Sequence, residues 1–143
     1  MPTSLEELLA IYEITRLSAV YARGLDRFSM DDILCVFTPD ATFDARPVGL
    51  TEFTGTEAIR EFFSHNQDVM ADQIHLFGNF IVDLDGPDEA HGTSYLWQDG
   101  HTHDGGRVHT VAFNVDKYQK TDGEWLITRR TVHPLLPPQL KAY

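Results

Sequence analysis

Residues 74–84, Ile-His-Leu-Phe-Gly-Asn-Phe-Ile-Val-Asp-Leu, constrain the fold most, because they have the pattern of a strand with no polar face. Successive side chains of a strand point to opposite faces, so we expect Leu76 and Val82 on one face and His75 and Phe77 on the other. A strand that is apolar on both faces is expected to be covered on both. His75 would then be a polar group in a covered wall, where it needs a hydrogen-bond partner.

A partner for His75 is found at the end of the first predicted helix. Ser4 and Glu7 form a capping box that begins a helix running to about Asp26. Steps of three and four along this helix define one stripe, which we expect to face the core: Leu5, Leu8, Tyr12, Thr15, Ala19, Ala22 and Asp26. A carboxylate therefore falls where a core residue is expected, and we predict that Asp26 pairs with His75. Tyr21 lies on the neighbouring stripe and places a phenol near this pair.

Helices precede strands along the chain, which is typical of an α+β domain. A short helix begins at Ser29 and ends before Pro39, a brief strand covers residues 41–45, and a third helix follows a Thr54–Glu57 capping box. The hydrophobic period then changes from 3.6 to 2, and four long strands are predicted at about residues 74–84, 89–99, 106–119 and 124–133.

These elements predict a curved antiparallel sheet with N-terminal helices on one side. A strongly twisted sheet of this kind curls into a cone around a cavity. The 143 residues suit a single domain spanning the whole chain, residues 1–143. The other face of the sheet also carries apolar residues, and we expect a second copy of the chain to cover it, forming a homodimer through the sheet.

Composition narrows the class of partner and the compartment. The formal net charge of −11 argues against nucleic acid and against an anionic membrane surface. Cys35 is the single cysteine, so a disulfide framework is excluded and a reducing compartment fits. The N-terminus lacks the pattern of a signal peptide, and no window reaches the length of a membrane span. We therefore expect a cytoplasmic protein whose partner is a small hydrophobic molecule.

The His75–Asp26 pair predicts general acid–base chemistry in a pocket. Neutral histidine accepts a proton efficiently near pH 7, and an adjacent carboxylate orients the ring and stabilises the imidazolium. Tyr21 would polarise a carbonyl or assist a leaving group. Loss of hydroxide or halide from the neighbouring carbon would make the reaction an elimination. A structural histidine and a helix-capping aspartate are the alternative interpretation of the same two residues.

Further residues are candidates for binding the substrate. Phe77 shares the face of His75, Tyr95 and Trp97 share one face of the next strand, and His109 is a candidate second acid or base. The histidines at 101 and 103 lie in a glycine- and aspartate-rich turn, so we assign no metal site there. Phosphate-binding loops and nucleotide fingerprints are lacking, and we infer no organic cofactor.

Several segments resemble the SnoaL-like branch of the nuclear transport factor two-like superfamily, over nearly the whole chain: Tyr21-Ala-Arg-Gly-Leu-Asp26, Phe37-Thr-Pro-Asp-Ala41, Gly55-Thr-Glu-Ala-Ile-Arg-Glu-Phe-Phe63, His75-x-x-x-Asn79 and Asp116-Lys-Tyr-Gln-Lys-Thr-Asp-Gly-Glu-Trp125. The resemblance implies a cone of curved sheet capped by three helices, often dimeric.

The same resemblance implies roles for individual residues. Tyr21, Asp26 and His75 match the tyrosine, aspartate and histidine of cofactor-independent scytalone dehydratase, bile acid 7α-dehydratase and hexachlorocyclohexane dehydrochlorinase. In these enzymes the histidine is the base and the aspartate supports it. Scytalone dehydratase uses a second histidine from the sheet, for which His109 and His101 are candidates.

Ketosteroid isomerase, which shares the fold, gives a contrasting expectation. Tyr21 and Asp116 resemble its oxyanion-hole residues, whereas Arg46 stands where its catalytic aspartate is found, with Asp44 two residues earlier. We therefore expect a dehydratase or dehydrohalogenase type of lyase. An isomerase or cyclase, and a binding module without catalytic activity, are the two alternatives, because this fold hosts many functions.

Overall fold

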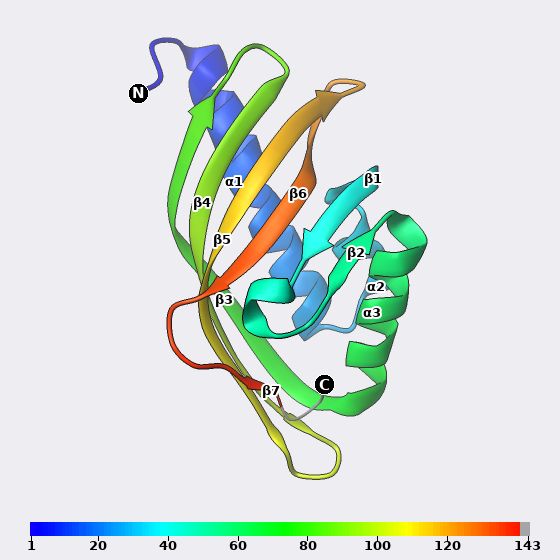
Figure 1. The fold of residues 1–143 in the computed structure, drawn as a ribbon. Helices are drawn as coiled ribbons and strands as arrows, with labels where there is room; N and C mark the ends of the chain where they lie inside the picture. The colour runs from blue at the N-terminus through cyan, green and yellow to red at the C-terminus, as the bar shows by residue number, and fades with distance from the viewer. Residues whose placement is uncertain (141–143) are drawn as a thin grey trace.

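The computed structural model describes residues 1–140 and shows a curved sheet that wraps around one end of a long helix (Figure 1). The helices are α1 (Leu5–Asp26), α2 (Met30–Leu34) and α3 (Thr56–Val69), with a short 3₁₀ turn, η1 (Arg46–Val48). The strands are β1 (Phe37–Asp44), β2 (Glu52–Thr54), β3 (Met70–Leu84), β4 (Glu89–Thr102), β5 (Arg107–Thr121), β6 (Glu124–Pro134) and β7 (Gln139–Leu140).

The sheet has the order β2-β1-β6-β5-β4-β3, with β7 paired to β5. The four long strands pair antiparallel, as predicted, and β1 runs parallel to β6, so the sheet as a whole is mixed. The parallel pair arises because β1 comes from the N-terminal helical half and is added beside the last long strand. The α+β cone fold is confirmed, with β3 at one end of the sheet.

The first helix covers the concave face of the sheet, and its buried stripe differs from the predicted one. Leu5, Leu8 and Tyr12 are more than half exposed, whereas the neighbouring stripe is buried: Ile14, Ser18, Tyr21 and Leu25. The first half of α1 lies beside the ends of β3 and β4 (Figure 1), and the stripe that contains Leu5, Leu8 and Tyr12 faces away from the sheet. Residues of both stripes are buried or partly buried only in the last turns of the helix, where Asp26 lies.

The capping box at Ser4 is confirmed, since its hydroxyl accepts a hydrogen bond from the backbone N–H of Glu7 at 3.1 Å. The capping box predicted at Thr54 is wrong, because Gly55 is the N-cap of α3 and no side chain caps it. Gly55 has φ +87°, a conformation that threonine would adopt only with strain.

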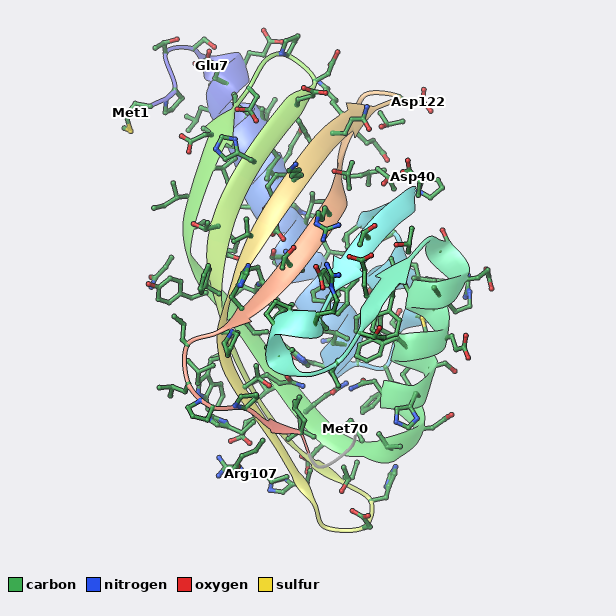
Figure 2. All side chains as sticks on the ribbon, viewed as in Figure 1. Met1, Glu7, Asp40, Met70, Arg107 and Asp122 are labelled. Carbon is green, nitrogen blue, oxygen red and sulfur yellow. The ribbon has the colours of Figure 1, made fainter. Side chains whose placement is uncertain are left out.

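Outward-facing residues of β3 and β4 remain exposed within the single chain. Ile74 and Leu76 are 44% and 56% exposed, so the predicted cover on both faces of β3 is not provided by residues 1–140. Figure 2 shows side chains projecting from this outer face, away from the helices. A bulge between Gly78 and Ile81 shifts the pairing of β3 with β4 by one residue. Val82 therefore packs against the core instead of sharing the outer face of Leu76.

Close packing between the first two helices depends on Gly24. A Cβ at this position would lie 2.8 Å from the backbone nitrogen of Ile33 and from the Cβ of Asp32. Contacts this short require the backbone of α2 to move, since the nearest atoms include main-chain atoms. The glycine thus allows α2 to pack on the last turn of α1, immediately before Asp26.

We expect Gly24→Ala to lower the free energy of unfolding. Alanine is favoured over glycine in a helix by about 1 kcal/mol, but overpacking typically costs about 1–3 kcal/mol, and here the clash is with backbone. Urea unfolding followed by circular dichroism measures the difference. Gly78→Ala is the control, because a Cβ there meets no atom within 4 Å. A Gly24→Ala protein as stable as the wild type would show that α2 yields easily.

Candidate functional site

The side chains of His75 and Asp26 are in direct contact. The Nδ1 atom of His75 lies 2.7 Å from Oδ1 of Asp26, within hydrogen-bond distance. The backbone N–H of His75 donates to Oδ2 of the same carboxylate at 3.2 Å. Because β3 ends the sheet, this N–H faces the open edge, and the carboxylate of Asp26 occupies the place where a further strand would bond.

Burial differs between the two partners of this His75–Asp26 pair. The side chain of His75 is 6% exposed, whereas that of Asp26 is 27% exposed. In the neutral form of His75, the hydrogen on Nδ1 is donated to Asp26, which leaves Nε2 as a proton acceptor. His75 is among the residues that line a cavity between the helices and the sheet. Asp26 does not line this cavity but lies with His75 in a second, outer groove between α1 and β3. The imidazole thus connects the cavity with a partly hydrated carboxylate.

The cavity has a volume of about 70 Å³ and is enclosed mainly by apolar side chains. Aromatic rings from α1, β1, α3 and β3 line it and pack edge to face, with centroids 5.5–5.9 Å apart: Tyr21, Phe43, Phe63 and Phe77. Of the predicted site residues, the structure brings Tyr21, His75 and Phe77 to the wall of this cavity, and Asp26 lies directly behind His75.

Tyr95, Trp97 and His109 are not at the cavity, and their prediction as pocket residues is corrected. They lie on the outer face of the sheet, where Tyr95 and Trp97 are 48% and 40% exposed and Trp97 contacts His109 edge to face. The odd-numbered residues of β4 and β5 face outward, and the even-numbered ones are buried. His101 is also outside, with 58% of its side chain exposed, in an ion pair with Asp72.

A buried ion pair that was not predicted from the sequence also lies at the cavity, where Arg130 is one of the lining residues. Arg130 on β6 is 1% exposed and donates two hydrogen bonds to Asp116 on β5, at 2.9 and 2.8 Å. It donates a further hydrogen bond to the hydroxyl of Ser18 on α1 at 2.8 Å. Its guanidinium carbon lies 5.1 Å from the ring centroid of Tyr21 and 5.2 Å from that of Phe77.

The hydrogen bonds of Asp116 show whether it can serve as a hydrogen-bond donor to a substrate oxygen. Both oxygens of Asp116 accept hydrogen bonds from Arg130, and one also accepts from the Tyr118 hydroxyl at 2.9 Å. Burial and the nearby carboxylate raise the pKa of Tyr118 far above its ordinary value. Asp116 is therefore an acceptor that holds Arg130, and it is not positioned as the hydrogen-bond donor of an isomerase oxyanion hole.

Thr110 and Asn114 on β5 also line the cavity and were missed, together with Gln98 on β4. The register explains their position, because His75 pairs with Gln98 and Gln98 pairs with Thr110 across three adjacent strands. The sequence signal for these residues is the run of alternating polar residues on β5 at 110, 114 and 116, within an otherwise apolar strand.

The segment at η1 is held by a second ion network. Asp44 accepts hydrogen bonds from Arg46 at 2.9 and 2.7 Å and from Arg129 at 2.8 Å. These hydrogen bonds hold the pKa of Asp44 at about 2, below its ordinary value of 3.8. The network fixes the turn that contributes Ala45, Val48 and Leu50 to the cavity wall.

We expect the lowered pKa of Asp44 to make stability depend on pH in the acid range. The native state keeps this carboxylate ionised while the unfolded chain takes up a proton, so its contribution to stability is complete above about pH 5 and is lost as the pH falls through 3.8 toward 2. Unfolding in urea at a series of pH values measures this slope. Asp44→Asn should lower stability at pH 7 and flatten the slope, and exposed Asp122→Asn is the control. An unchanged slope in Asp44→Asn would assign the acid sensitivity to other groups.

The fold and this arrangement define a cone-shaped α+β protein with a His–Asp pair beside a largely apolar cavity. A family model of the SnoaL-like domain matches residues 6–131, and the chain belongs to this family, within the nuclear transport factor two-like fold. No curated protein matches the chain. None of the helices within residues 1–140 is long and apolar enough to cross a membrane.

Solved structures agree with this assignment. A presumed aromatic ring hydroxylase from Novosphingobium aromaticivorans is 32% identical, with a TM-score of 0.87 and coverage of 92% of this chain and 94% of that one. A presumed scytalone dehydratase from the same species has 18% identity, a TM-score of 0.84, and coverage of 92% and 87%. A hexachlorocyclohexane dehydrochlorinase of LinA type 3 from Novosphingobium barchaimii has 18% identity, a TM-score of 0.82, and coverage of 94% and 92%.

Proposed function

We propose that the chain is a cofactor-independent lyase that eliminates water or a hydrogen halide from a small hydrophobic cyclic substrate. The observation that carries this proposal is the 2.7 Å contact between His75 and Asp26, with His75 on the wall of an apolar cavity. The dehydratase and dehydrochlorinase names of the structural neighbours support an elimination, and the name of the 32% identical neighbour supports a ring as substrate.

The proposed reaction begins with removal of a proton by Nε2 of His75. The electrons of the broken C–H bond form the new C=C bond while the bond to the leaving group breaks with its electron pair. Throughout the reaction, Asp26 accepts a hydrogen bond from the Nδ1–H group of His75, and its negative charge stabilises the imidazolium. Tyr21 provides a hydroxyl for a substrate oxygen. The imidazolium returns its proton to a departing hydroxide, giving water, or releases it to solvent when a halide departs.

The environment of Asp44 favours the lyase over an isomerase as the function of this chain. An isomerase of this fold needs a carboxylate base near the turn at residues 46–48, and Asp44 is the closest aspartate in sequence. Two arginines hold it with a pKa of about 2, which makes it a weak base at neutral pH. Asp44 is also not among the residues that line the cavity. A product of unchanged mass would nevertheless support an isomerase.

Replacement of either member of the pair should abolish elimination. We expect His75→Ala and Asp26→Asn to reduce turnover by about 10²–10⁴-fold, because the base is lost or misoriented. The assay is mass spectrometry of products from scytalone, a 7α-hydroxy bile acid and hexachlorocyclohexane, scored for loss of water or hydrogen chloride. Circular dichroism establishes that each variant is folded.

His101→Ala is a matched control for this experiment, because His101 also pairs with an aspartate, at 3.0 Å, but is exposed to solvent. It should retain full activity. Full activity in His75→Ala would dismiss the mechanism, and ligand-dependent thermal stabilisation without any product, indifferent to His75, would favour the binding module.

We also propose that two copies associate through the outer face of the sheet. This face carries exposed aromatic and aliphatic side chains in adjacent rows of β3, β4 and β5: Leu76, Tyr95, Trp97 and Val115. One carboxylate of this face, Asp99, is paired with Arg107 at 2.7 Å, which lowers the repulsion expected between two such faces of a protein with a net charge of −11.

Light scattering measures this association. We expect the mass of a dimer for the wild type and of a monomer for Trp97→Lys, which places a like charge at the centre of a symmetric interface. Leu8→Lys, which changes an exposed residue of α1, is the control and should remain dimeric. A monomer mass for the wild type at all concentrations would remove the proposal.

A further inference from the structure

The side-chain amide of Gln73 on β3 connects three elements next to the His75–Asp26 pair. Its nitrogen, Nε2, donates to the backbone carbonyl of Leu25, the next-to-last residue of α1, at 2.7 Å. The same nitrogen donates to Oδ1 of Asn66 on α3 at 3.0 Å, and Nδ2 of Asn66 donates back to Oε1 of Gln73 at 3.2 Å. Both hydrogens on Nε2 and the oxygen of this amide therefore have partners within the protein.

The orientation of both amides follows from the carbonyl of Leu25. A backbone carbonyl only accepts hydrogen bonds, so Gln73 must turn its nitrogen toward it. Asn66 must then accept the second N–H through its oxygen and return its own N–H to the oxygen of Gln73. Asn66 is 3% exposed and Gln73 is partly buried, so water competes little for these groups. The end of α1 thus sets the arrangement of an amide pair that joins α3 to β3.

The last turn of α1 is attached to β3 at two points. Leu25 and Asp26 are consecutive residues of α1, and their partners on β3 are Gln73 and His75. Side chains two residues apart on a strand point to the same face and lie about 7 Å apart along it. With the carboxylate of Asp26 as the only attachment, the helix end could pivot about it. The hydrogen bond from Gln73 to the preceding residue prevents this rotation.

We propose that Gln73 is a positioning residue for the elimination, which holds the carboxylate of Asp26 in the geometry that His75 needs as a base. The inference rests on the proposed function, because the role is defined by the base that is positioned. Gln73 does not line the cavity, so it acts through the geometry of the pair and not through contact with the substrate. A displacement of about 1 Å at a catalytic group lowers a rate by about 100-fold.

The ring N–H of His75 reports the contact with Asp26 in the absence of any substrate. In NMR spectra of protein with isotope-labelled histidine, we expect a low-field resonance from the hydrogen on Nδ1, assigned by its loss in His75→Ala. This hydrogen should exchange slowly with water, because the side chain is 6% exposed. His91 and His101 also contact aspartates through Nδ1, but more than half of each side chain is exposed, so their ring hydrogens should exchange faster.

Gln73→Met removes the amide and keeps an unbranched side chain of similar length. We expect the resonance of His75 to move to higher field and its exchange with water to become at least about tenfold faster, because the end of α1 gains freedom to pivot. An unchanged resonance in Gln73→Met would overturn the proposal. Absence of the resonance from the wild type would also overturn it, since there would be no contact to position.

Ile127→Val is the control for a general loss of stability. Ile127 on β6 is fully buried and does not line the cavity, so the smaller side chain leaves a void in the core and spares the hydrogen bonds of Gln73 and His75. Both variants should lower the Tm, whereas only Gln73→Met should change the resonance of His75. An equal change of the resonance in both variants would contradict a positioning role.

Steady-state kinetics provide a second measurement, with whichever of scytalone, a 7α-hydroxy bile acid and hexachlorocyclohexane the wild type converts. Gln73→Met should lower kcat at least about tenfold and leave KM within about threefold, because Gln73 does not line the cavity. Ile127→Val should retain the wild-type kcat. A raised KM with unchanged kcat in Gln73→Met would make Gln73 part of substrate binding and would refute the positioning role.

The two measurements separate this inference from the proposed function. A shifted resonance in Gln73→Met together with full elimination in His75→Ala would refute the function and leave the attachment of Asp26 to His75 by Gln73 standing. An unchanged resonance in Gln73→Met together with lost elimination in His75→Ala would refute the positioning role and leave the mechanism standing.

Discussion

The carboxylate of Asp26 joins the end of α1 to the edge of the sheet through two hydrogen bonds to one residue. One oxygen accepts from the backbone of His75 and the other contacts its imidazole at 2.7 Å. Both bonds end on the carboxylate of Asp26, so a displacement of this carboxylate would break the contact with the ring and free an N–H at the edge of β3. A helix terminus therefore sets both the position of an edge strand and the tautomer of a buried base.

A second buried charge stabilises the same cavity. Arg130 links β5 to α1 through Asp116 and Ser18, and its guanidinium packs near the rings of Tyr21 and Phe77. Removal of one partner from such a pair typically costs about 3–5 kcal/mol, because the other charge is left buried and alone. The cavity is thus bounded by the hydrogen-bonded His75–Asp26 pair, which is partly exposed to water, and by the Arg130–Asp116 ion pair, which is buried. The partly hydrated His75–Asp26 pair is therefore suited to proton transfer, whereas the buried Arg130–Asp116 pair is suited to holding a fixed arrangement of hydrogen-bonding groups.

The sequence was sufficient to predict the cone fold and the contact between Asp26 and His75. Both depend on patterns that survive local irregularity, namely the order of helices and strands and the position of a carboxylate at the end of a helix. The helical stripe was wrong over most of its length, since periodicity shows which residues share a face but not which of two neighbouring stripes faces the sheet. The faces of β4 were assigned incorrectly for a related reason. Tyr95 and Trp97 share a face as predicted, but both faces carry apolar residues, and alternation alone does not distinguish inside from outside.

The Arg130–Asp116 pair shows most clearly what the sequence could not reveal. Counting back from the Asp122-Gly123 turn places Asp116 opposite Arg129, because Thr121 pairs with Glu124. A bulge between Lys117 and Tyr118 shifts the register by one residue, and Asp116 pairs with Arg130 instead. Of two consecutive arginines, the bulge directs Arg130 into the core and leaves Arg129 to Asp44 on the outer side of the turn.

The volume of the cavity indicates which part of its wall moves when a ring enters. At about 70 Å³ it is roughly half the size of an engineered cavity of about 150 Å³ that binds benzene. The Asp26 contact fixes α1 against β3, and the arginine pairs fix β5, β6 and the η1 turn. Leu140 on β7 also lines the cavity, yet β7 has two residues and pairs only with β5 among residues 1–140. Because β7 is held by few backbone pairs, we expect a substrate to enlarge the cavity there before it disturbs the His75–Asp26 or the Arg130–Asp116 pair.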